Sequence, residues 1–381
     1  MRTPNLILVL SYSILISLLV SADALQKGPK NVEKWFKKLP NTKEKVTKLH
    51  FYFHDVVSGK NPTSISVARA NSTFTSPSYF GLVSIIDNPL TLGSGPKSKV
   101  VGRAQGITGS ASSDELCLLM TLNFVFMDGK YNESTLSIVG YNPINYEYRE
   151  MPIVGGSGVF RLARGIATAN TAKFNAKTGN AVVEYNVMDK EMDKLCTILM
   201  LFSIVSVITH AKNIAQGPEA VEDWFKNLPN AKEKVTKLHF YFHDIVGGKN
   251  PSAITVAQSN STFQSPTFFG LIRMMDNALT VGPEPDSKIV GRAQGIYGSA
   301  SFEEIGLLMT LNYVFTGDKY NGSTISVLGH NPILHKYREM PIVGGSGIFR
   351  LARGIATAQT IWFNLTTQDA VVEYNVIVLH Y

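Results

Sequence analysis

Residues 49–55 read Leu-His-Phe-Tyr-Phe-His-Asp, and residues 238–244 repeat the same seven residues. Large apolar side chains at positions 49, 51 and 53 alternate with more polar ones at 50, 52 and 54. This period of two is typical of a β-strand that turns one face to a core. We therefore expect an aromatic strand in each half of the chain, ending at Asp55 and at Asp244.

The stretch belongs to a repeat that runs through the whole chain at one offset. His54-Asp55 returns as His243-Asp244, and Arg149-Glu-Met-Pro152 returns as Arg338-Glu-Met-Pro341, so the copies are 189 residues apart (243 − 54 and 338 − 149). Two copies of this length indicate a duplicated domain rather than the many short units of a solenoid. We expect one domain at 25–187 and a second at 212–381, each long enough to bury its own core.

The composition narrows the class of protein. Of the 381 residues, 44% are hydrophobic and 17% are charged, which favours ordered globular domains over disorder. The formal charge of +7 is modest, and the densest basic stretch, within residues 34–48, is diluted in the second copy by Glu222 and Asp223. We interpret it as a solvated face and expect no nucleic-acid partner, with attraction to an anionic cell-wall matrix as the alternative.

Cysteine and histidine do not form the pattern of a metal site or a disulfide framework. Cys196 lies in an apolar run, and Cys117 is replaced by Gly306 in the second copy. His50 and His54 share one face of the first expected strand, but no third ligand stands at a suitable spacing. We expect no metal and no cofactor, and a structural role for these histidines.

An apolar leader precedes each copy. Residues 1–24 contain Arg2, an apolar run and the small residues of Ala22-Asp-Ala24, as a secretory signal peptide does. Residues 188–211 repeat this design internally, with an apolar run too short for a membrane span of ~20 residues. We expect secretion to the extracellular space. Three explanations of the internal segment stay open: two adjacent genes joined in one reading frame, a fusion cut after Ala211, or an internal anchor.

Secretion gives meaning to five Asn-x-Ser/Thr sequons. They are Asn71, Asn132, Asn260, Asn321 and Asn364. The first four form two pairs that match between the copies and lie near expected turns. We expect these sequons to mark surface loops that carry glycans.

Strand patterns dominate the rest of each copy. Residues 118–126 and 134–140 predict a hairpin, which recurs at 307–329, and a turn at 177–180 leads into a strand at 181–187. The one helical candidate in copy one is short, around 32–39. Many antiparallel strands with little helix predict an all-β fold, a closed barrel or a sandwich, and closure removes exposed strand edges.

Several polar residues recur in both copies among apolar strands. They are Asp55, Asp87, Arg103, Arg149, Arg161 and Arg164, with partners Asp244, Asp276, Arg292, Arg338, Arg350 and Arg353. One interpretation is internal pairing of aspartate with arginine that holds the barrel. The other is a pocket in which a desolvated carboxylic acid donates or accepts a proton, with aromatic walls for a flat substrate.

At these residues the chain resembles the plant dirigent protein family. The resemblance rests on Phe-Tyr-Phe-His-Asp55, Val-Gly-Arg-Ala-Gln-Gly106 and Arg-Glu-Met-Pro-Ile-Val-Gly-Gly-Ser-Gly158, with their partners in copy two. It implies two eight-stranded antiparallel β-barrels of the allene oxide cyclase type, secreted to the apoplast and assembled as homo-oligomers, usually trimers. It also implies a function without redox chemistry of its own. A separate laccase or peroxidase supplies phenoxy radicals, and the protein directs coniferyl alcohol radicals to couple with one handedness into lignans such as pinoresinol.

The resemblance assigns roles to individual residues. It implies that Asp55, Asp244, Arg149, Arg338 and Tyr297 act in catalysis, whereas copy one has Thr108 where copy two has Tyr297. Six further residues are expected to contact the substrate: Asp87, Arg103, Asn142, Asp276, Arg292 and Asn331. Asn142 and Asn331 replace an aspartate expected in lignan-forming members.

Asparagine at that position is more similar to the branch that includes pterocarpan synthase. The second hypothesis is therefore a lyase that dehydrates an isoflavanol through a quinone methide and closes the ring stereospecifically. A third hypothesis is a defence-related module that binds cell-wall carbohydrate. Dependence on an oxidase separates the first hypothesis from the second.

Overall fold

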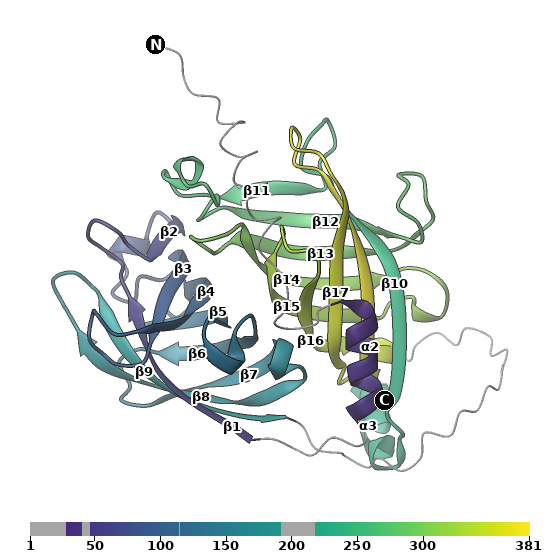
Figure 1. Ribbon diagram of the computed structural model, residues 1–381, viewed down its shortest axis with the longest axis horizontal. Coiled ribbons are helices and arrows are strands. Elements are labelled where there is room, and N and C mark those ends of the chain that lie inside the picture. Colours follow the sequence, from purple (N-terminus) through teal and green to yellow (C-terminus); the bar gives the residue numbers. More distant parts are fainter. Residues whose placement is uncertain (1–27, 40–45, 114, 192–217) are drawn as a thin grey trace.

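The computed structural model describes residues 28–39, 46–113, 115–191 and 218–381 (Figure 1). The expected signal peptide at 1–24 lies outside these residues, as does the internal leader from residue 192 onward. Residues 188–191 are described, and they continue the last strand of copy one, where Met188 pairs with Lys48. That strand therefore runs four residues past the boundary expected at 187.

The first copy folds into a closed antiparallel barrel. Its strands are β1 (Val46–Asp55), β2 (Ser64–Ala68), β3 (Val83–Thr91), β4 (Val100–Ser110), β5 (Cys117–Phe126), β6 (Thr135–Pro143), β7 (Arg149–Ser157), β8 (Ala163–Phe174) and β9 (Ala181–Glu191). The sheet runs β1-β9-β8-β7-β6-β5-β4-β3, and pairing of β1 with β3 closes it, while β2 extends the edge of β3. Eight strands thus form the barrel, as predicted.

The second copy forms a second barrel with the same order. Its strands are β10 (Lys234–Asp244), β11 (Ala253–Ala257), β12 (Ile272–Thr280), β13 (Ile289–Ser299), β14 (Gly306–Phe315), β15 (Thr324–Pro332), β16 (Arg338–Ser346), β17 (Arg353–Phe363) and β18 (Ala370–His380). Pairing of β10 with β12 closes it. The repeated heptapeptides at 49–55 and 238–244 lie in β1 and β10.

Helices are few in the described residues. The α-helices are α2 (Pro29–Lys38) and α3 (Pro218–Asn227), and short 3-10 turns occupy Thr73–Thr75, Gly129–Tyr131, Gly158–Phe160, Leu228–Asn230, Thr262–Gln264, Asp318–Tyr320 and Gly347–Phe349. The helix predicted near 32–39 is thus confirmed as α2. In the described part of the chain, no helix has the length and apolar character needed to cross a membrane.

Aromatic side chains fill each barrel because the alternation along the strands directs them inward. Phe51 of β1 meets Phe124 of β5 with ring centroids 4.9 Å apart, and Tyr185 of β9 lies beside both rings. Glycine is required where a neighbouring strand approaches closely: a β-carbon on Gly106 would lie 2.3 Å from the carbonyl oxygen of Thr121. A few polar side chains are buried among these apolar ones, Arg149 and Arg338 being the largest.

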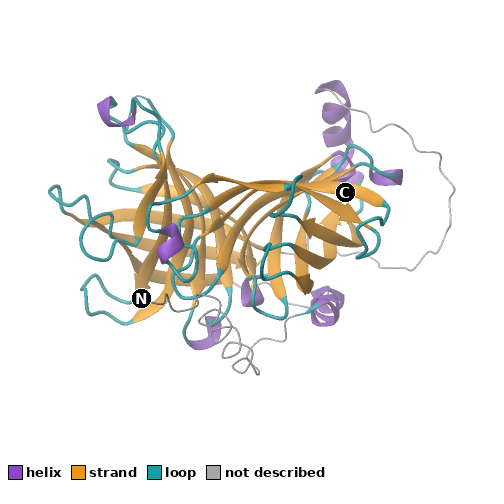
Figure 2. Ribbon diagram, turned by 90° about the horizontal axis from the view of Figure 1, so that it is seen from above, coloured by secondary structure: helices purple, strands orange, loops and turns teal. Residues whose placement is uncertain are grey.

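The two barrels pack side by side through outer faces of their sheets (Figure 2). The contact buries six apolar side chains: Ile85, Phe269, Ile272, Ala300, Leu308 and Leu328. Barrel one contributes Ile85 of β3, whereas barrel two contributes residues around β12, β14 and β15. The equivalent strands β7 and β16 face each other in the contact, whereas the buried side chains around them come from different positions in the two barrels.

The unequal burial of equivalent residues confirms this asymmetry. Phe269 is 2% exposed in the contact, but its equivalent in barrel one, Phe80, is 47% exposed. Likewise Leu308 is 1% exposed and Leu119 is 48% exposed. Each barrel thus keeps one of the two complementary faces outside the contact.

Helix α2 joins the two barrels. Val32 and Phe36 lie against Ile355 and Leu379 on the outer face of barrel two, although the helix precedes barrel one in the chain (Figure 1). A buried ion pair between Arg161 and Glu339 crosses the same junction.

Candidate functional site

The carboxyl group of Asp55 lies inside barrel one, where β1 ends. Phe51 and Phe53 point into the core, so the same alternation turns Asp55 inward. The side-chain amide of Asn88 donates to its Oδ1 over 3.1 Å. Burial raises the pKa of Asp55 to about 6, against the opposing effect of this hydrogen bond. A carboxyl group of this kind exchanges a proton near neutral pH.

Barrel two has the same arrangement around Asp244, with one addition. Asn277 donates to Oδ1 of Asp244 over 3.0 Å, and the hydroxyl of Tyr297 donates to Oδ2 over 3.2 Å. Burial raises the pKa of Asp244, while Asn277, Tyr297 and the charge of Arg273 oppose the rise. Asp244 and Tyr297, each expected from the resemblance to act in catalysis, are therefore hydrogen-bonded to each other.

A buried arginine stands deeper in each lumen. Arg149, 3% exposed, donates from Nε to Oδ1 of Asn142 over 3.1 Å and from Nη1 to Thr171 over 2.9 Å. Arg338 donates in the same way to Asn331 over 3.0 Å. Neither guanidinium forms an ion pair with a described residue. Each lumen thus holds a cation whose protein partners are neutral, and burial lowers its pKa.

In barrel one, the hydroxyl of a buried tyrosine, Tyr185, is influenced by the charges of both Asp55 and Arg149. Tyr185 stands in register with Phe51 on one side and Ala169 on the other, and Ala169 pairs with Arg149. The charges of Arg149 and Asp55 both act on the pKa of its hydroxyl, which burial raises. Tyr374 holds the equivalent place in barrel two. Sequence reasoning missed this pair, although its inward parity on the last strand was available.

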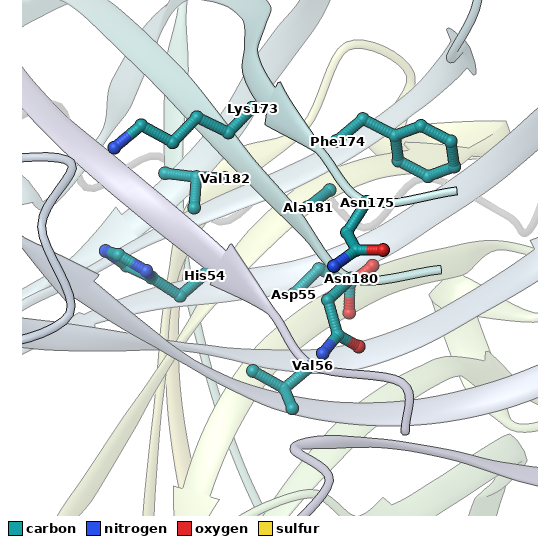
Figure 3. A pocket seen from close by; sticks show the side chains of 9 residues that line it. All are labelled: His54, Asp55, Val56, Lys173, Phe174, Asn175, Asn180, Ala181 and Val182. Atoms are coloured by element: carbon teal, nitrogen blue, oxygen red, sulfur yellow. The ribbon is translucent and has the colours of Figure 1, made fainter. Parts of the chain in front are cut away.

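A cavity of about 250 Å³ opens at the mouth of barrel one (Figure 3). The lining residues come from the end of β1 and from the β8–β9 hairpin: His54, Asp55, Val56, Lys173, Phe174, Asn175, Asn180, Ala181 and Val182. Asp55 lies beside Asn180, while Lys173 and His54 occupy the other side (Figure 3). Asp55 is therefore one of the residues that line the rim of barrel one beside the β8–β9 hairpin.

The mouth of barrel two contains Arg273, which sequence reasoning also missed. Arg273 pairs across β12 and β13 with Tyr297, and the equivalent pair in barrel one is Ser84 with Thr108. Its guanidinium carbon lies 6.0 Å from the centre of the Tyr297 ring. The sequence signal was available, because both members of one cross-strand pair differ between otherwise similar copies.

The structure places four of the expected substrate contacts outside the lumen. Asp87 points outward, since its neighbour Asn88 points inward, and it accepts a hydrogen bond from the backbone amide of Phe302 in barrel two over 2.6 Å. Arg103 bonds the same carboxylate. Asp276 and Arg292 form the equivalent pair on a face that no described residue covers, where Asp276 is 53% exposed. We correct the sequence expectation here: these residues hold the outer faces and are not brought to Asp55 or Asp244.

The histidines of β1 and β10 also lie on the outer side. His50 bonds Glu184 at 2.7 Å, and His54 bonds Thr91 at 2.7 Å, so the two rings have separate partners. Among the described residues, no three His, Cys, Asp or Glu side chains gather as metal ligands.

Comparison with known proteins identifies the family. The profile of the family described as "Dirigent-like protein" matches residues 46–188 and 235–379, which together are more than half of the chain. The chain belongs to the dirigent family. Dirigent protein 23 of Arabidopsis thaliana is 49% identical over 178 residues, covering 46% of this chain and 95% of that protein. Pterocarpan synthase 1 of Glycyrrhiza echinata is 44% identical over 195 residues, covering 51% and 100%.

A solved structure of a pterocarpan synthase dirigent protein is 51% identical, covers 39% of this chain and 92% of its own, and superposes with a TM-score of 0.38. The matched ranges of the family profile coincide with the two barrels, so both barrels of this chain are dirigent domains. The resemblance drawn from the sequence motifs is thereby confirmed.

Proposed function

We propose that this dirigent protein binds phenolic ligands in its barrel lumens and imparts stereoselectivity on the coupling of phenoxy radicals, such as those of coniferyl alcohol. The observation that carries the proposal is the buried carboxyl group of Asp55, and of Asp244, at the end of a strand whose aromatic side chains fill the barrel. A separate laccase or peroxidase supplies the radicals. Holding two flat radicals in one orientation selects the face on which they couple.

The lumen also supports the step after coupling. Coupling of two such radicals gives a quinone methide, whose carbonyl oxygen accepts a proton while a hydroxyl of the same molecule adds to the methide carbon. Asp55, with its raised pKa, donates that proton and recovers one from the attacking hydroxyl. Arg149 offers a fixed positive charge to the developing phenolate, because its own protein partners are neutral.

A second candidate function is a lyase that dehydrates an isoflavanol. Arg338 donates to Asn331, which stands where lignan-forming members have an aspartate. Because Asn331 cannot supply a proton, Asp244 is the acid of the site, which favours the lyase. In this reaction Asp244 protonates the departing hydroxyl, and water leaves while the conjugated phenol gives its proton to the carboxylate, which forms the quinone methide. The second phenol then adds to the methide carbon, and Asp244 donates a proton to the quinone methide oxygen and recovers one from the attacking hydroxyl. The 44% identity to a protein named pterocarpan synthase supports the same candidate.

One experiment separates the two functions. The full chain is incubated with coniferyl alcohol plus laccase, and in parallel with a racemic isoflavanol and no oxidase, and products are resolved by chiral chromatography. An excess of one pinoresinol enantiomer over laccase alone supports radical guidance. Racemic pinoresinol together with oxidase-independent loss of water from the isoflavanol supports the lyase and overturns the first proposal.

We also propose that the chain is secreted to the apoplast and glycosylated. The apolar leader at 1–24 supports secretion. Asn71, Asn260 and Asn321 are exposed at turns, whereas Asn132 and Asn364 are half-buried. Peptide mass mapping of protein from native tissue, with and without glycosidase, tests both points and reports whether the two copies remain joined.

We also propose that several copies of the chain assemble into a homo-oligomer with ring symmetry. The contact between the two barrels buries side chains from different positions in each barrel, and contacts that join unlike positions form rings when the rotation closes. Phe80 and Leu119 remain exposed on barrel one where their equivalents are buried in the contact. The native mass of the full chain in solution tests this: a single-chain mass at micromolar concentration contradicts it.

A further inference from the structure

The two lumens of the chain differ in one cross-strand pair at the barrel mouth. Barrel two has Arg273 opposite Tyr297, whereas barrel one has Ser84 opposite Thr108. Arg273 points into barrel two, because Met275 and Asn277, two and four residues further along β12, do so. Tyr297 also belongs to the core of this barrel. Barrel two therefore has one more cation at its mouth than barrel one has at the equivalent position.

The guanidinium of Arg273 is held by neutral groups. Its Nη2 donates to Oε1 of Gln368 over 2.8 Å, and its Nε donates to the hydroxyl of Thr255 at the longer distance of 3.5 Å. It forms no ion pair with any residue that the structure describes. An arginine has five N–H donors, so the guanidinium retains donors for a further acceptor.

The nearby acidic groups do not neutralise it directly. Asp244 is engaged by Asn277 and Tyr297. Asp369 accepts hydrogen bonds from the backbone amides of Val246 and Gly247 at 2.7 and 2.9 Å, which compensate its charge. Arg273 thus hydrogen-bonds uncharged groups, as the two acids beside it do, and no ion pair with a described residue occupies its donors.

We propose that barrel two binds a phenolic ligand that carries an ionised carboxylate, that barrel one binds the uncharged counterpart, and that Arg273 makes this distinction. The inference rests on the proposed function, because it assumes that the lumens bind phenols. The planar guanidinium matches a carboxylate through two parallel hydrogen bonds. A carboxylic acid is ionised at neutral pH, whereas a phenol with a pKa of about 10 must first lose a proton.

Neighbouring groups suit the rest of such a ligand. The Tyr297 ring lies beneath the guanidinium and offers an aromatic wall. Gln368, which fixes the guanidinium, sits in the β17–β18 hairpin, so Arg273 spans from β12 to that hairpin across the mouth. A ligand carboxylate at Arg273 therefore has the Tyr297 ring beside it.

The test uses two ligands that differ only at one end. Ferulate carries a carboxylate where coniferyl alcohol carries a hydroxymethyl group, and each is titrated into the full chain by calorimetry without oxidase. Arg273→Ser is expected to weaken ferulate binding by at least about tenfold, the loss typical of one charge-assisted contact, and to leave the affinity for coniferyl alcohol unchanged. Arg273→Lys keeps the charge without the planar fork, so an intermediate loss is expected.

A control variant removes the same charge elsewhere. The control is Lys319→Ser. Lys319 lies on the β14–β15 hairpin, at the end of the barrel opposite Asp244, and contacts Tyr320. This variant should leave ferulate binding unchanged, and an equal loss in Lys319→Ser and Arg273→Ser overturns the inference. Ferulate affinity that is the same in Arg273→Ser and in the wild type also overturns it. If coniferyl alcohol binds neither barrel, the proposed function itself fails.

Discussion

The hydroxyl of Tyr297 donates to the carboxylate of Asp244 over 3.2 Å, and Thr108 forms no corresponding bond to Asp55 among the described residues. The two barrels thus present the same acid in different surroundings. Asp55 depends on Asn88 alone, while Asp244 has Asn277, Tyr297 and the nearby charge of Arg273. One chain therefore holds two buried acids, each with a raised pKa, in different electrostatic surroundings.

Removing the Tyr297 hydroxyl should raise the pKa of Asp244. The hydrogen bond stabilises the carboxylate, so Tyr297→Phe favours the protonated form. Carboxyl carbon NMR titration of the full chain measures this. Thr108→Val is the matched control and should leave Asp55 unchanged. An unaltered titration of Asp244 in Tyr297→Phe contradicts the prediction.

The raised pKa of Asp55 predicts how stability depends on pH. The folded state holds the proton up to about pH 6 and the unfolded chain only to about 3.8, so the free energy of unfolding falls as pH rises through this window. The largest change this shift allows is about 3 kcal/mol. Asp55→Asn removes this titration. The free energy of unfolding of the variant, measured with urea, should therefore rise relative to that of the wild type between pH 4 and pH 7. A difference that does not vary with pH refutes this.

Asn331 should matter for stability because it satisfies a buried arginine. Asn331→Ala leaves Nε of Arg338 without its acceptor, and the free energy of unfolding should fall by about 1–3 kcal/mol. Asn331→Asp keeps an acceptor oxygen and should lose less. Denaturant unfolding of both variants decides the point, and equal losses argue against the assigned role of Asn331.

The ion pair between the barrels offers a test with an internal control. Glu339 is 1% exposed in its side chain and pairs with Arg161, so Glu339→Gln leaves a buried guanidinium without its counter-charge and should cost about 3–5 kcal/mol. The equivalent residue of barrel one, Glu150, is exposed. Glu150→Gln should cost little in the same urea unfolding measurement. Similar losses in the two variants would refute an interface role for Glu339.

The sequence predicted the barrels because their alternation is strong and repeated. The aromatic strand at 49–55, the hairpin at 118–140 and the short helix near 32–39 all appear where the pattern indicated. The type of each of these elements is determined by residues that are close in the chain, so it can be predicted from the sequence. The family motifs named Asp244 and Tyr297 separately, and the hydrogen bond between them became visible only in the structure.

The rest of the site depends on contacts between distant segments. Asp87 is repeated and charged like Asp55, but its parity turns it toward the other barrel, where it bonds Phe302. That contact has no local signal. Arg273 has a different kind of signal: it differs between the copies, whereas the expected site residues are nearly all shared by them. The roles of Asn142 and Asn331 as arginine partners became visible only in the structure.

The central claim is that the buried carboxyl groups of the two lumens direct stereochemistry. The most direct measurement is the enantiomeric excess of pinoresinol formed from coniferyl alcohol and laccase with the full chain, compared with an Asp55→Asn, Asp244→Asn double variant. We expect an excess of one enantiomer for the wild type and a racemate for the double variant, at equal rates of alcohol consumption. A racemic product with the wild type, or an excess that survives in the double variant, would contradict it.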